Sequence, residues 1–167
     1  MLCVLAMLSA DAERKLERLR EKALPGIRFS SPLHAHITLA TWLPEDAGTF
    51  MDSCEEMLRN TRSFTVRYEW IEVFSETSII VATPSVPDEL ASIHNRIVKK
   101  YGDSLDRWTS AEWYPHSTLL YNPSTDLDAV CAEMQKHFVP FEARIDAIEF
   151  SRVEEKGYTV LKRIILP

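Results

Sequence analysis

Two short segments of the chain contain the same arrangement of a histidine, a threonine and a leucine. Residues 34–42 read HAHITLATW, and residues 116–121 read HSTLLY. In each segment a histidine stands two residues before a threonine and three before a leucine, and these histidines, His36 and His116, lie 80 residues apart. The whole chain has only five histidines, so chance placement explains the repeat poorly.

The repeated residues are suited to the chemistry of phosphate esters. Residues i and i+2 of a strand project from one face, so His36 would lie beside Thr38, and His116 beside Thr118. If the two strands face each other, one neutral imidazole can accept a proton from an attacking oxygen while a protonated one donates to the leaving oxygen. Histidine has an ordinary pKa of about 6.5 and so provides both forms near neutral pH. The threonine hydroxyls can donate hydrogen bonds to the non-bridging phosphate oxygens.

The elements that must position these residues are expected in the same order twice. The hydrophobic patterns predict strand, helix, motif strand, helix and strand, then the same five elements again, and one last strand. The expected ranges are 1–10, 11–24, 34–42, a helix opening at 44–46, 63–74, 77–84, 87–102, 116–121, 124–138, 141–154 and 158–167. We therefore expect a single α+β domain, residues 1–167, that is built from two duplicated lobes.

A second feature also repeats. In the strand after the first motif, the alternation of apolar residues changes phase at Ile71 and Val73, and after the second motif it changes at Ile148 and Phe150. The two changes lie 77 residues apart. Each predicts a β-bulge or a change of packing partner, at matched positions in the two lobes.

The motifs resemble the paired H-x-T/S-hydrophobic signatures of the 2H phosphoesterase superfamily, which includes the 2′-5′ RNA ligase-like proteins and RNA cyclic phosphodiesterases. The matching residues are His36-Ile37-Thr38-Leu39 and His116-Ser117-Thr118-Leu119. The resemblance implies a bilobal, pseudo-symmetric α+β fold, with two antiparallel-sheet lobes and outer helices around a central cleft.

The resemblance also implies an activity and roles for four residues. It implies metal-independent, cofactor-free action on 2′,3′-cyclic or 2′-5′ phosphodiesters of RNA ends or small nucleotides. His36 and His116 would be the catalytic acid and base, and Thr38 and Thr118 would hold the phosphate. The sequence does not indicate which histidine is the acid. Two other functions stay open: a non-catalytic module that binds nucleotide or RNA phosphates, and 2′-5′ RNA end-joining.

Other residues near the motifs are candidates for substrate contacts. Trp42 and Tyr114 have the same strand parity as the motif histidines, so each either stacks on a nucleobase or packs against its lobe. Tyr121 has the opposite parity and is expected in the core. Arg28, in the loop before the first motif, is a candidate cation for a substrate phosphate.

Three histidines remain outside the paired motif. His34 shares a face with His36 and could form half of a metal site, but no second ligand cluster of clear spacing accompanies it, so we expect no metal. His94 is expected at the edge of the core. His137 falls in the last turn of a helix, where an imidazolium interacts favourably with the helix dipole.

Composition restricts the partners and the compartment. With 46% hydrophobic residues, 26% charged residues and a net charge of −6, the chain is typical of a globular protein, argues against DNA binding and favours small substrates over long RNA. Three separated cysteines without a CxxC pair indicate buried thiols and a cytoplasmic location. The first ten residues are expected as a buried strand rather than a signal peptide, and no apolar run is long enough to span a membrane. We expect a monomer.

Overall fold

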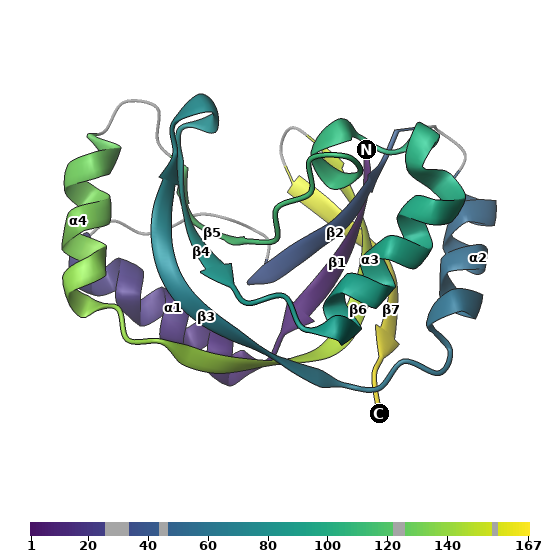
Figure 1. Cartoon of the computed structure of the whole chain (residues 1–167), viewed down its shortest axis with the longest axis horizontal. Coiled ribbons are helices and arrows are strands. Elements are labelled where there is room, and N and C mark those ends of the chain that lie inside the picture. Colours follow the sequence, from purple (N-terminus) through teal and green to yellow (C-terminus); the bar gives the residue numbers. More distant parts are fainter. Residues whose placement is uncertain (26–33, 44–46, 122–125, 155–156) are drawn as a thin grey trace.

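The computed structural model describes residues 1–25, 34–43, 47–121, 126–154 and 157–167. These residues form an α+β fold with four α-helices and seven strands (Figure 1). The strands are β1 (Leu2–Leu8), β2 (His36–Trp42), β3 (Phe64–Phe74), β4 (Ile79–Pro84), β5 (Ser117–Tyr121), β6 (Phe141–Glu154) and β7 (Gly157–Ile165). The helices are α1 (Ala10–Ala23), α2 (Gly48–Leu58), α3 (Asp88–Tyr101) and α4 (Leu127–His137). The predicted order of elements is confirmed, although the expected helix opening at 44–46 lies outside the described residues.

All seven strands belong to one antiparallel sheet. Its order is β2-β1-β6-β3-β4-β5, and β7 pairs with β6. In both halves of the chain the motif strand pairs with the first strand of its own half, and that strand pairs with the last strand of the other half's five elements: β2-β1-β6 and β5-β4-β3. The α+β antiparallel fold is therefore confirmed, with the two halves joined in a continuous sheet by the pairing of β3 with β6.

The helices connect the two halves. The helix before each motif strand contacts the motif strand of the other half: α1 contacts β5, and α3 contacts β2. As Figure 1 shows, α1 lies with α4 at one end of the molecule, and α3 lies with α2 at the other. Each helix turns an apolar stripe inward, for example Ala12, Leu16 and Leu19 of α1. Because each of these helices packs against the motif strand of the other half, the contacts fix the two motif strands relative to each other.

Both motif strands contain a β-bulge at the leucine of the motif. The residues on either side of Leu39 pair with two adjacent residues of β1, so Leu39 is the extra residue in β2. Leu119 is the extra residue of β5, opposite β4. Both leucines are fully buried. A bulge reverses the face on which later residues of the strand lie, with consequences for the site.

The predicted phase changes are also confirmed. The pairing of β3 with β4 skips Glu69, and the pairing of β6 with β1 skips Asp146, so the two bulges lie 77 residues apart. Beyond them Ile71 and Ile148 are buried. The matched bulges show that the two halves share their local distortions as well as their topology.

The remaining structural expectations concern the ends of the fold and the thiols. Every residue of β1 is buried, as expected. Cys3, Cys54 and Cys131 are buried and free, which confirms the prediction of buried thiols. Within the described ranges, no helix is long and apolar enough to cross a membrane.

Candidate active site

The structure brings the two motifs together, although their strands lie at opposite ends of the sheet order. The Ser117 hydroxyl, in the variable position of the second motif, donates a 2.7 Å hydrogen bond to the carbonyl of His36. The Trp113 indole donates a 2.9 Å hydrogen bond to the carbonyl of Thr38. The sheet must therefore curve until the beginning of β5 meets β2 (Figure 1).

The bond from Ser117 is supported from the core. The Tyr68 hydroxyl, fully buried, lies 2.5 Å from the Ser117 hydroxyl. Because the single proton of Ser117 goes to His36, Tyr68 must donate to Ser117. These two buried hydrogen bonds fix the distance between the two motifs. The structural role of Ser117 was not predicted from the sequence.

Both motif histidines have the same orientation. The Nδ1 atom of His36 lies 2.7 Å from the carbonyl of His34, and Nδ1 of His116 lies 2.8 Å from the carbonyl of Tyr114. A carbonyl only accepts, so each Nδ1 carries a proton. In the neutral ring, Nε2 is then the nitrogen with a lone pair. Each histidine can thus accept a proton at Nε2 or, when protonated, donate one from there.

The environment lowers the pKa of both histidines. Burial lowers the pKa of His36, the bond to the His34 carbonyl raises it, and a charge on His116 lowers it further. Burial also lowers the pKa of His116, with the bond to Tyr114 and the charge of Glu72 acting in the opposite direction. Because a charge on one ring disfavours a charge on the other, the pair takes up a first proton more readily than a second.

The threonines of the motifs lie in two equivalent rows of cross-strand neighbours. Leu5 pairs with Thr38 on one side and with Glu149 on the other. In the other half, Val81 pairs with both Thr118 and Glu72. Directly opposite residues share a face of the sheet, so each row places a glutamate two strands away from a motif threonine.

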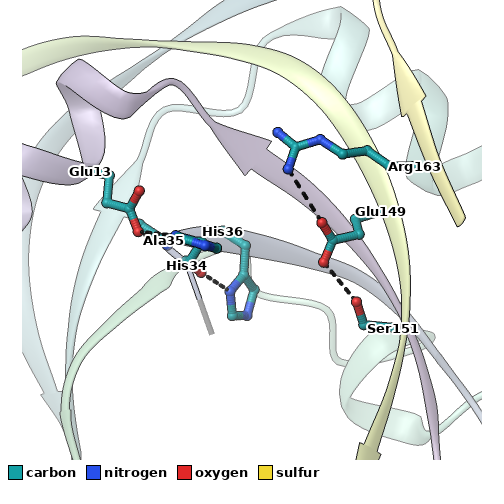
Figure 2. A network of polar contacts seen from close by, with 7 residues as sticks. All are labelled: Glu13, His34, Ala35, His36, Glu149, Ser151 and Arg163. Atoms are coloured by element: carbon teal, nitrogen blue, oxygen red, sulfur yellow. Dashed lines mark hydrogen bonds and ion pairs between the residues drawn. The ribbon is translucent and has the colours of Figure 1, made fainter. Parts of the chain in front are cut away.

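Glu149 and Glu72, the glutamates of these two rows, each act electrostatically on one motif histidine. Glu149 is only 2% exposed, and its carboxylate accepts from Ser151 at 2.7 Å and pairs with Arg163 at 3.5 Å (Figure 2). The charge of Glu149 raises the pKa of His36, and that of Glu72 raises the pKa of His116. Neither carboxylate was predicted from the sequence, although their 77-residue spacing matches that of the phase changes.

The structure favours one of the two alternatives for Trp42 and contradicts the expectation for Tyr121. Trp42 is 9% exposed and stacks on Phe50 with ring centroids 4.3 Å apart, which favours packing over base stacking. The prediction of Tyr121 in the core is wrong, because its side chain is 64% exposed. The bulges at Leu39 and Leu119 explain where both side chains lie, since each bulge reverses the parity of the later residues in its strand.

Tyr114 and Arg28 complete the candidate substrate contacts. Tyr114 is 43% exposed, and its hydroxyl donates a 2.8 Å hydrogen bond to Glu72. Its ring makes a T-shaped contact with the ring of Phe74, which makes another with the ring of His116. Arg28 lies outside the described residues. Arg163, paired with Glu149, is a cation on the motif side of the sheet that was not predicted from the sequence.

The other histidines have structural partners. His94 is more buried than expected, at 5% exposure, and it donates to the carbonyl of Thr109 and stacks on Trp113. His137 pairs with Glu133 at 3.3 Å in the last turn of α4. Among the residues that the structure describes, no group of three or more histidine, cysteine or acidic side chains could hold a metal ion.

Comparison with known proteins establishes the family. The sequence matches the model of the 2′-5′ RNA ligase superfamily over residues 8–157. The chain therefore belongs to this superfamily, and the resemblance to 2H phosphoesterases is confirmed. No curated protein matches the sequence.

Solved structures show the same fold. Escherichia coli LigT complexed with 3′-AMP is 18% identical with a TM-score of 0.67, over 99% of this chain and 96% of LigT. A protein described as a phosphoesterase has the same identity and TM-score, over 99% and 97% of the two chains. The protein TT0787 of Thermus thermophilus is 17% identical with a TM-score of 0.65, over 99% and 97%. At these identities the likeness shows the fold.

Proposed function

We propose that the chain is a metal-independent phosphodiesterase that acts on 2′,3′-cyclic or 2′-5′ phosphodiester bonds of RNA ends or small nucleotides. One observation carries the proposal: His36 and His116 are brought together, and each has its Nδ1 proton committed to a carbonyl and its Nε2 available for proton transfer. Binding a phosphate alone requires no such acid and base.

The geometry supports an acid–base mechanism. For a 2′,3′-cyclic phosphate, the Nε2 atom of one neutral histidine accepts a proton from water as the water oxygen bonds to phosphorus. The P–O bond to one ribose oxygen breaks, and the other, protonated histidine donates its Nε2 proton to that oxygen. The products are a phosphomonoester and a free hydroxyl. Hydrogen bonds from Thr38 and Thr118 stabilise the charge on the non-bridging oxygens.

The structural neighbours favour a nucleotide as substrate. LigT has been crystallised with 3′-AMP, phosphate, NADP+ and ATP. By analogy with the fold, the nucleotide phosphate would lie between the two motifs here. We propose further that the chain works as a cytoplasmic monomer. We also propose that it is one domain of two duplicated lobes, which the matched topology and matched bulges support.

The pH dependence of kcat/KM tests catalysis against simple binding. Catalysis needs one neutral and one protonated histidine, so we expect a bell-shaped profile. Because burial lowers the pKa of both rings, the maximum should fall below the ordinary histidine pKa of about 6.5. Activity decreases above it as the acid loses its proton, and below it as the base gains one. If instead nucleotide binds without turnover and binding weakens steadily with rising pH, the chain is a binding module.

A further inference from the structure

The carbonyl that orients each motif histidine belongs to a residue that is itself held by a glutamate. In the first half this residue is His34, whose carbonyl accepts from Nδ1 of His36. One carboxylate oxygen of Glu13, on α1, lies 2.9 Å from Nδ1 of His34 and accepts from the backbone N–H of Ala35 at 3.1 Å. Figure 2 shows this series of contacts from Glu13 to His36. The carboxylate thus fixes the residue at both its side chain and the following peptide.

In the second half Tyr114 occupies the equivalent place. Its carbonyl accepts from Nδ1 of His116, and its hydroxyl donates to Glu72 on β3. The same oxygen of Glu72 also accepts from Thr83 at 2.8 Å and Trp70 at 2.9 Å. Three donors on one oxygen fix the carboxylate, so Glu72 is a rigid anchor for the tyrosine.

Glu13 and Glu72 do not occupy equivalent positions in the two halves of the chain. Glu13 lies on the helix α1 and holds a histidine, whereas Glu72 lies on the strand β3 and holds a tyrosine. Both nevertheless reach the side chain of the residue two positions before a motif histidine. A common result from different elements indicates that the position of these two carbonyls matters to the site.

We propose that Glu13 and Glu72 are positioning residues for the acid–base pair. By holding His34 and Tyr114, they keep the proton of each motif histidine on Nδ1 and direct Nε2 to the substrate. The proposal rests on the phosphodiesterase function. Without the glutamate contact, the preceding residue can move, and the imidazole can rotate or carry its proton on Nε2, where it cannot act as a base. Outer partners that orient metal-bound histidines typically affect activity by about 10–100-fold, and we expect an effect of the same size for these metal-free histidines.

Two substitutions remove the contacts with little other change. Tyr114→Phe deletes the bond to Glu72 but retains the ring, the Tyr114 carbonyl and the charge of Glu72. Glu13→Ala deletes both contacts of Glu13, and Glu13→Gln restores a carbonyl oxygen that can accept from Ala35. The matched control is Glu133→Ala, because Glu133 also pairs with a histidine, His137, but on α4 and in neither motif.

The experiment measures the tautomers of His36 and His116 by ¹⁵N NMR without substrate, then kcat and KM. We expect wild type and Glu133→Ala to show the Nδ1–H form of both rings. Tyr114→Phe should increase the Nε2–H form of His116, and Glu13→Ala that of His36. The same variants should lower kcat about 10–100-fold with little change in KM, and Glu13→Gln should recover most of the loss.

Two results would overturn the proposal. One is an unchanged tautomer and an unchanged kcat in both Tyr114→Phe and Glu13→Ala. The other is a loss of kcat in these variants that simply follows a loss of folded protein, with the tautomers of the folded fraction unchanged. A wild-type protein without turnover would refute the phosphodiesterase function instead, while the NMR result would still decide whether the glutamates control the tautomers.

Discussion

Replacing either motif histidine with alanine is expected to lower kcat by about 10²–10⁴-fold, the usual contribution of a general acid or base. His36→Ala removes one of the two Nε2 atoms and His116→Ala removes the other, so neither variant can complete both proton transfers. Because the two rings act as a unit, the double variant should be little slower than the worse single variant. The measurement is kcat and kcat/KM on a 2′,3′-cyclic nucleotide with EDTA present.

Two controls separate catalysis from folding. Both rings are only half-buried, so thermal unfolding should show that each variant remains folded. His137→Ala removes a histidine from the last turn of α4 and should retain wild-type activity. A folded His36→Ala or His116→Ala protein with kcat near that of wild type would contradict the assigned roles.

Replacing the motif threonines with valine is expected to lower kcat by about 10²–10³-fold for each residue. Valine retains the β-branched shape that suits β2 and β5, and it replaces the hydroxyl with a methyl group that cannot donate a hydrogen bond. The hydroxyls of Thr38 and Thr118 are proposed to donate to phosphate oxygens whose negative charge grows in the transition state. The loss should therefore appear in kcat and kcat/KM together, measured by steady-state kinetics on the same substrate.

Serine is the matched replacement at both positions. Thr38→Ser and Thr118→Ser restore the hydroxyl and should recover most of the activity that the valine variants lose. If the valine variants instead raise KM and leave kcat unchanged, the hydroxyls only bind the ground state. In that case the stabilisation of the transition state would have to come from other groups, such as the Arg163 guanidinium.

Much of the fold could be predicted because its patterns are local. Strand alternation and helical stripes predicted the order of all eleven elements, and matched phase changes in the chain predicted the bulges in β3 and β6. The bulges at Leu39 and Leu119 could not be predicted in this way. Each lies in a short apolar run, and its position is defined only by pairing with β1 or β4.

Only the part of the site that lies within each motif could be predicted from the sequence. The i, i+2 spacing of each motif identifies the histidine and the threonine. The contacts by which Ser117, Glu13 and Glu72 act on the site join residues that are 21 to 81 positions apart in the chain, so no local pattern marks them. Only the pairing of the strands and the packing of α1 bring these residues beside the motifs.

Turnover by the wild-type chain in EDTA, with 2′,3′-cyclic nucleotides and 2′-5′ dinucleotides as substrates and 3′-5′ dinucleotides for comparison, tests the central claim most directly. We predict hydrolysis of a 2′,3′-cyclic or 2′-5′ bond without added metal, with a phosphomonoester or the separated nucleosides and nucleotides as products. Nucleotide binding without turnover of any of these bonds, and with the same affinity in His36→Ala and His116→Ala, would contradict the proposed function.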